Sequence, residues 1–267
     1  VTNVQISSVS GSTKSGDSSD DTHQFSGSLF ISGSSIALGD GNNNVVLGKN
    51  VNFNIGGATN FTAVGYQSAG GDTSTGIGGD QITVVGAQAG KKMQQNPHRT
   101  SLFGAGAGAA LTVGLDNTFL GANAGNDLTV ADRNVFVGSW AGYQTVDVDN
   151  AVIIGYQAGY SNMTSAADGT IAIGYQAGYA LTSAADNIAI GYAALLNHTT
   201  GGYNIAIGKN TMYDTDAGST SLGSQHNIFI GLSAGGGVWA DAASNYNVGI
   251  GNYSMDAALN GALNNTA

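Results

Sequence analysis

The chain has 267 residues, with 43 glycines, one proline, no cysteine and a formal net charge of −10 at pH 7. This acidity argues against a nucleic-acid partner, and without cysteine neither disulfides nor thiolate metal sites can form. All acidic residues are aspartate, which favours turns over helices. This choice of aspartate predicts an all-β chain. No apolar run approaches the length of a transmembrane helix, about 18 residues, so we expect no membrane insertion.

Residues 1–34 are predicted to form a lead-in segment. The Ser/Gly/Asp tract at 7–20 is typical of a weakly ordered stretch. The apolar run within 25–34, set between Gly and Ser, predicts a short strand that starts the rest of the fold. Since the sequence begins at Val1 without a methionine or a signal peptide, we expect it to be part of a longer chain.

Residues 35–256 repeat one unit, a short apolar run that ends in glycine. These closing glycines are Gly39, Gly48, Gly65, Gly86, Gly104, Gly121, Gly138, Gly155, Gly174, Gly191, Gly208, Gly231 and Gly251. Six of the steps between them are 17 residues long, and longer steps are read as loops inserted between copies. A short fixed period predicts a parallel β-solenoid of about 13 coils.

Each unit predicts one strand, whose residues are numbered here from its closing glycine. Positions −1 and −3 are large or β-branched, as in Ile188 and Ile190, and they share one face of the strand. We expect this face to line the inside of the coil. Position −2 then points outward, yet it is apolar too, so the strand needs cover on both faces.

A second copy of the chain is the expected cover, because one coil is too short to build a second layer. Position −2 is therefore predicted to form the subunit interface of a closed homo-oligomer. The predicted interface residues are Phe119, Phe136, Ile153, Ala172, Ala189, Ala206 and Phe229.

Other rows are interpreted as structural. Asparagine recurs at position −4, as in Asn134 and Asn204, where stacked amides can hydrogen-bond along the rod. Alanine recurs at position +3, as in Ala124, and predicts a narrow second wall. Residues 257–267 lack the pattern and are expected to be a cap or a linker to a further domain.

The units Asn187-Ile-Ala-Ile-Gly191 and Asn204-Ile-Ala-Ile-Gly208 resemble the head repeats of trimeric autotransporter adhesins. The form Gly155-Tyr-Gln-Ala-Gly159 is similar to repeats of bacteriophage tail-fibre proteins. The resemblance covers about residues 36–254. It implies a left-handed parallel β-roll packed as a homotrimer, outside the cell, in a phage tail fibre or alternatively on a bacterial surface. The 17-residue step is longer than in compact adhesin heads.

Enzyme chemistry is not supported by any motif. Asp147 with Asp149, or Asp214 with Asp216, offers paired carboxylates for glycoside hydrolysis, but aspartates in such turns are more often turn formers. His226 near the second pair lacks metal-ligand spacing. Ser233 lies in a Gly-x-Ser-x-Gly match without the helix that a nucleophile elbow needs. We expect neither an enzyme nor a cofactor nor a metal.

Receptor contact is the remaining functional hypothesis. The candidate residues are the two tryptophans, expected to lie exposed, and a basic turn: Trp140, Trp239, Lys91, Lys92 and Arg99. Indole rings can stack on sugars, and the cations can meet anionic glycans. We expect a homotrimeric fibre segment that binds a host cell-surface glycan or protein. The rivals are a fibre-borne polysaccharide depolymerase and an ice-binding solenoid, and the latter lacks the regular Thr-x-Thr ladder that it would need.

Overall fold

The computed structural model describes residues 43–51, 57–70, 77–94, 97–215, 223–239, 242–257, 259 and 261–267. The predicted lead-in and the first closing glycine, Gly39, lie outside these residues. The described chain forms twelve strands. In chain order they are β1 Val45–Leu47, β2 Thr59–Val64, β3 Asp80–Val85, β4 Ser101–Phe103, β5 Thr118–Leu120, β6 Val135–Val137, β7 Val152–Ile154, β8 Ile171–Ile173, β9 Ile188–Ile190, β10 Ile205–Ile207, β11 Ile228–Ile230 and β12 Val248–Ile250.

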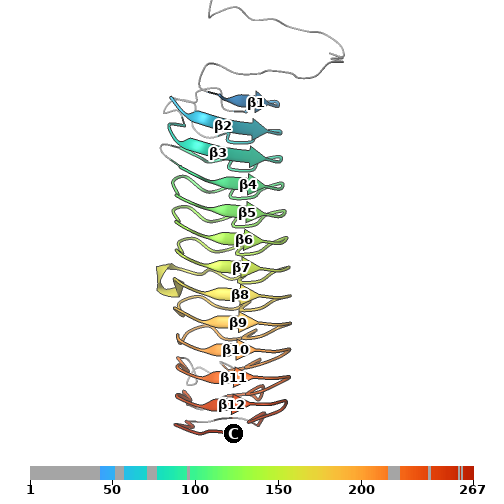
Figure 1. The fold of residues 1–267 in the computed structure, drawn as a ribbon, viewed down its shortest axis with the longest axis vertical. Coiled ribbons are helices and arrows are strands. Elements are labelled where there is room, and N and C mark those ends of the chain that lie inside the picture. The colour runs from blue at the N-terminus through green and yellow to red at the C-terminus, as the bar shows by residue number, and fades with distance from the viewer. Residues whose placement is uncertain are drawn as a thin grey trace, which may run out of the picture. The chain divides into compact units, whose positions relative to one another are not determined.

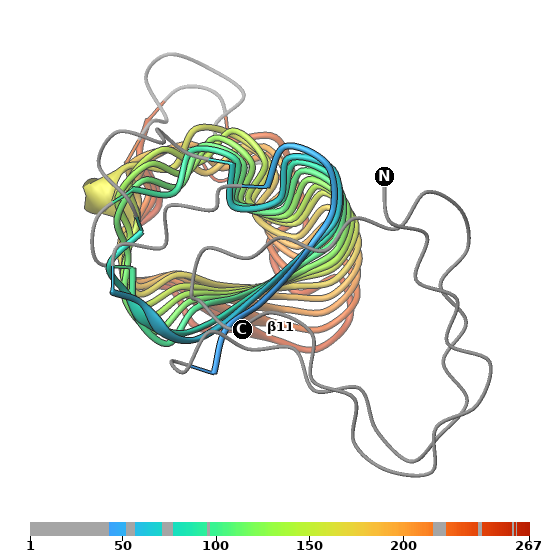
Figure 2. The ribbon, with the colours of Figure 1, turned by 90° about the horizontal axis from the view of Figure 1, so that it is seen from above.

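The strands form one parallel sheet in which each strand pairs with the next along the chain (Figure 1). Register follows the repeat, since Ala189 of β9 pairs with Ala206 of β10. Seen along the stack, successive coils lie over one another (Figure 2). The predicted parallel β-solenoid is therefore confirmed, with twelve strands in the described residues where about 13 coils were expected. The short helix η1, Ser165–Ala167, lies in the loop between β7 and β8. No helix among the described residues is long and apolar enough to cross a membrane.

The closing glycines stack into a continuous column at the end of the strands. At Gly155 the backbone has φ +134°, and a Cβ there would lie 2.3 Å from the carbonyl oxygen of Gly174. The same contact recurs at Gly138, whose Cβ would lie 2.5 Å from the oxygen of Gly155. Only glycine tolerates both the dihedral angle and the close approach of the next coil. The repeated glycine is thus a condition for the spacing of the coils.

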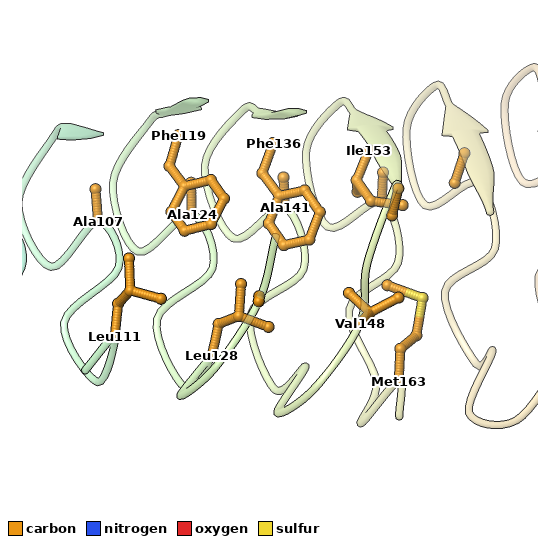
Figure 3. Packing of buried hydrophobic residues seen from close by; sticks show 14 of the residues in the cluster. Ala107, Leu111, Phe119, Ala124, Leu128, Phe136, Ala141, Val148, Ile153 and Met163 are labelled. Atoms are coloured by element: carbon orange, nitrogen blue, oxygen red, sulfur yellow. The ribbon is translucent and has the colours of Figure 1, made fainter. Parts of the chain in front are cut away.

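The two faces of each strand are assigned the wrong way round by the sequence-based prediction. Position −2 points into the coil, where Phe119, Phe136 and Ile153 have no exposed surface (Figure 3). The other predicted interface residues, Ala172, Ala189, Ala206 and Phe229, are equally buried. Positions −1 and −3 point outward instead, and Leu120 is 51% exposed. Alternation fixes which residues share a face but not which face is the interior, and here the row with alanine at four coils fits a narrow core.

Inside the coil, the side chains at position −2 of the strand face the small side chains at position +3 of the turn that follows it. The predicted alanine row is confirmed as buried, with Ala124 opposite Phe119 and Ala141 opposite Phe136 (Figure 3). The rings of Phe119 and Phe136 stack at a centroid distance of 4.9 Å and an interplanar angle of 16°. A large side chain on one wall is thus accommodated by alanine on the other.

The predicted asparagine ladder is present and fully buried. Asn134 Nδ2 donates to the Val148 carbonyl at 2.7 Å, and its Oδ1 accepts the Ala151 N–H at 2.8 Å. The Asn134 N–H in turn donates to Asn117 Oδ1 at 3.1 Å. Each amide therefore satisfies backbone groups of the following coil that no strand pairing reaches.

The stack continues past the predicted domain boundary at residue 257. Asn265 occupies the asparagine row, since its N–H donates to Asn247 Oδ1 at 3.1 Å. Thr266 forms a parallel bridge with Val248 of β12. Residues 261–267 thus continue the stack of coils, and the expectation of a cap or linker at 257–267 stays a prediction.

Candidate functional site

The largest unassigned feature is the outward face of the sheet. Position −1 presents a row of large apolar side chains, among which Leu47, Leu120 and Ile250 are 46%, 51% and 61% exposed. Position −3 adds a second row. It carries hydroxyl residues in four early coils, Thr62, Thr83, Ser101 and Thr118, and Val or Ile in every coil from β6 to β12. A parallel sheet is normally covered on both faces, and no described segment of the chain covers this one.

A row of exposed side chains follows the strands at position +1. Tyr156, Tyr175 and Tyr192 stack at centroid distances of 5.6 Å and 5.0 Å, and each is at least 42% exposed. Lys209 continues the row, with its Nζ 5.5 Å from the centroid of Tyr192. In coils of β3 to β6 the same position holds only alanine or serine.

A second exposed row precedes the strands at position −5, where the backbone is left-handed in almost every coil. Arg99 forms a two-point ion pair with Asp116 that includes an Nη2 to Oδ2 distance of 2.8 Å. Hydrogen bonds from Arg99 lower the pKa of the Asp116 carboxyl. Further along, the imidazole of His226 stacks between Tyr203 at 4.8 Å and Tyr246 at 5.0 Å. This row is thus charged in the early coils and aromatic in the late ones.

Trp140 is half-buried in a stack of tyrosines on the turns that follow the strands. Its ring lies 4.7 Å from Tyr143 and 6.0 Å from Tyr160, and Tyr160 stacks on Tyr179 at 5.0 Å. Burial, followed by the neighbouring Tyr179 and Tyr143, raises the pKa of Tyr160. Because the rings stack on one another, they present mainly their edges to a ligand.

The other predicted receptor residues divide into three cases. Trp239 is completely buried and packs edge-on against Phe229 at 5.8 Å, so the expectation that it is exposed is wrong. Arg99 is exposed, but its charge is paired with Asp116. Lys91 and Lys92 are exposed on the turn after β3. The structure therefore leaves two lysines and the partly buried Trp140 as accessible candidates, on separate coils.

The aspartates weighed as catalytic acids have structural partners. Asp149 Oδ1 accepts the Asp132 backbone N–H at 2.7 Å, and Asp168 Oδ1 accepts that of Asp149 at 2.8 Å. Asp214 Oδ1 accepts a hydrogen bond from Asn197 at 3.2 Å. Asp147 is exposed, and Asp216 lies outside the described residues. Asp149 is thus one rung of a carboxylate ladder that joins coils, a role that the spacing of the aspartates did not indicate.

Two remaining sequence candidates take part in ordinary packing. His226 belongs to the aromatic stack at position −5, and among the residues that the structure describes no three His or Asp side chains gather as metal ligands would. Ser233 lies in the turn after β11, where its N–H donates to the Lys209 carbonyl at 2.9 Å. The turn ends at Gly235, and no helix follows through residue 239.

Comparison with known proteins gives no further assignment. No protein-family model, no curated protein and no solved structure shows a significant match to this chain. The functional argument therefore depends on the surfaces described above.

Proposed function

We propose that this chain is a rigid, receptor-presenting segment of a homotrimeric surface fibre, outside the cell, most compatible with a phage tail fibre. A bacterial surface adhesin of the trimeric autotransporter type is the alternative. The observation that carries the proposal is the apolar outward face of the sheet, which runs the length of the stack and has no cover in the described chain.

The area of this face suits a stable subunit interface. Twelve strands at about 4.8 Å spacing span about 53 Å, and the seven positions from −5 to +1 span up to about 20 Å. The face therefore offers on the order of 1,000 Å² per copy, compared with about 800 Å² per partner in a standard interface. At about 25 cal/mol per Å², covering even part of it would favour association strongly.

A closed ring of copies around an axis parallel to the rod covers this face in every copy. Closed rotational symmetry is the usual form of homo-oligomers, and three such sheets around one axis form a triangular prism. The interface thus consists of positions −1 and −3, in place of the position −2 residues predicted from the sequence. The stacked coils give a stiff spacer, because each is hydrogen-bonded to the next along its whole strand.

Receptor contact is assigned to the turns that remain outside this prism. Lys91 and Lys92 are exposed cations on one turn, and Trp140 with its tyrosine stack lies several coils further on. One copy of each offers a weak site. Three copies on one rod bind a dense cell-surface glycan together, so that effective concentration raises the affinity. The proposal includes no catalytic step, cofactor or metal.

Sedimentation equilibrium tests the assembly directly. We expect a mass near three chains of 26.6 kDa each, and Leu120→Glu, which places a charge in the apolar face, should give monomers. Val113→Glu is the matched control, because Val113 is also exposed but lies outside the strands. A wild-type monomer would contradict the proposal.

Binding to host cells tests the receptor function separately. The trimer should bind, and a variant with Lys91→Ala, Lys92→Ala and Trp140→Ala should lose binding while keeping its mass. Absence of binding by the wild-type trimer would leave only the spacer role. Release of new reducing ends from host polysaccharide, abolished by Asp147→Asn or Asp214→Asn, would favour the depolymerase instead.

A further inference from the structure

The two exposed rows that flank the outward face vary in size in opposite directions along the rod. Where position −5 is long, position +1 is small: Gln81 accompanies Ala87, Arg99 accompanies Ala105, and Arg133 accompanies Ser139. Where position +1 is tyrosine, position −5 is small or short: Asn60 with Tyr66, Asn150 with Tyr156, Gly169 with Tyr175, and Asp186 with Tyr192. In the coil of β12, Tyr246 accompanies Asn252.

Within one chain these residues do not touch. Positions −5 and +1 are six residues apart at opposite ends of a strand, which separates them by up to about 20 Å. Nearly all of them are exposed in the single chain, including Gln81, Ala87 and Tyr156. The left-handed backbone at position −5 favours Asn, Asp and Gly there, but no contact inside the coil links the size at one position to the size at the other.

We infer that the cover of this face is a second copy of the same chain, parallel and at the same height, with position −5 of one copy against position +1 of its neighbour. Rotation about an axis parallel to the rod brings the start of each strand in one copy next to the end of the same strand in the next copy. Each coil then meets itself, so that in most coils a large side chain in one row faces a small one in the other. This inference rests on the proposed trimeric fibre and defines its interface.

Three coils depart from the size pattern, and the chemistry of one of them fits the pairing. In the coil of β5 both residues are short, Asp116 and Ala122. In the coil of β10 both residues are long, but they are Tyr203 and Lys209, a ring and a cation that attract each other. In the coil of β11 the residues are His226 and Leu232, and Leu232 is already half-buried in one chain. The pattern thus holds by size in most coils and by chemistry in one more.

The row at position −3 favours parallel copies over antiparallel ones. Antiparallel rods would place the hydroxyl residues of the early coils on the aliphatic residues of the late coils, for example Thr83 on Ile205. Hydroxyl groups buried against aliphatic side chains lose hydrogen bonds to water without replacement. Parallel copies at equal height instead place hydroxyl on hydroxyl and aliphatic on aliphatic. Polarity and size therefore lead to the same arrangement.

A double-mutant cycle in one coil tests the pairing. Ala87→Tyr puts a large residue opposite Gln81, and we expect it to raise the dissociation constant of the oligomer at least about tenfold, or about 1.4 kcal/mol. Adding Gln81→Asn recreates the Asn/Tyr combination of the β2 and β7 coils and should restore association to within about threefold. Both positions are exposed in one chain, so circular dichroism should show an unchanged fold.

Ala105→Tyr is the matched control, since it is the same change at an exposed position +1 one coil further along. Its neighbour at equal height is Arg99, so it should also weaken association, but Gln81→Asn should not rescue it. Sedimentation equilibrium supplies the readout for wild type, Gln81→Asn alone, each tyrosine variant, and each tyrosine variant combined with Gln81→Asn. If Gln81→Asn fails to rescue Ala87→Tyr, or rescues both tyrosine variants equally, the pairing is wrong although the assembly stands. If wild type is a monomer, the proposed function fails as well.

Discussion

The assignment of faces makes a sharp prediction about Phe136. In the fold its ring is fully buried, stacks on Phe119 at 4.9 Å, and lies so close to Gly142 that a Cβ there would meet its ring at 2.5 Å. Phe136→Ala removes this ring from the inside of the coil and leaves a cavity that neighbouring coils, tied by hydrogen bonds on both sides, cannot close. We expect the free energy of unfolding to fall by about 3–5 kcal/mol, of which the ring pair accounts for about 0.5–1.5 kcal/mol.

Leu120→Ala is the matched comparison on the outward face. Leu120 is 51% exposed in one chain, so truncating it removes about half of the about 1.5–3 kcal/mol that a buried leucine contributes, or about 1 kcal/mol. Its main effect should be weaker association. Urea unfolding followed by circular dichroism, at equal protein concentrations, measures the first quantity, and sedimentation equilibrium measures the second.

Phe136→Ala should therefore show its main effect in the unfolding assay, and Leu120→Ala in the association assay. Phe136→Ala should unfold at lower urea while its folded fraction keeps the wild-type mass. Leu120→Ala should dissociate at higher protein concentration with little loss of fold. If Phe136→Ala dissociated the oligomer and left the fold intact, position −2 would be the interface after all, and our account of the two faces would be refuted.

Three further predictions concern the columns that join the coils. Gly155→Ala should lower the free energy of unfolding in urea by more than Gly57→Ala. Both glycines have positive φ, which costs alanine about 1–3 kcal/mol, but only at Gly155 would the new Cβ meet backbone, at 2.3 Å. Equal losses would contradict the close-approach argument. Asn134→Ala should cost about 2–6 kcal/mol in the same assay, since it leaves the Val148 carbonyl and the Ala151 N–H buried without partners; a loss under about 1 kcal/mol would mean that water replaces the amide. Arg99 lowers the folded-state pKa of Asp116, so the stabilisation from this pair is fully present above the ordinary pKa of about 3.9 and is lost as pH falls through the lower folded-state pKa. The melting temperature of Asp116→Asn should therefore decline less between pH 5 and pH 2 than that of wild type. Parallel curves for the two proteins would exclude the linkage.

The periodicity of the sequence was sufficient to predict the coil, the strands and the stacking order. The closing glycines, the asparagine row and the alanine row recur at fixed offsets because each coil must repeat the same backbone contacts with the next one. The choice of the inner face was not determined by that regularity. Rows −1 and −2 are both apolar, and only the small side chains at Ala172, Ala189 and Ala206 indicate which row fits a narrow interior.

Functional residues were harder to predict because single side chains carry no periodic signal. Trp239 follows a run of glycines and was expected on the surface, yet it fills the coil beside Phe229. Asp149 was weighed as a catalytic acid, although its carboxylate accepts a backbone N–H of the preceding coil. The opposite size variation at positions −5 and +1 is visible in the sequence, but its meaning depends on knowing that both rows flank one uncovered face.

The direction of the inter-coil hydrogen bonds has a mechanical consequence. They run along the rod, as do the amide contacts of Asn117 with Asn134 and of Asn187 with Asn204. A pulling force on the two ends of a single rod loads the bonds of the outermost coil first, so the rod should peel one coil at a time. With a 17-residue repeat, each rupture would release about 50 Å of chain, the extended length minus one coil spacing.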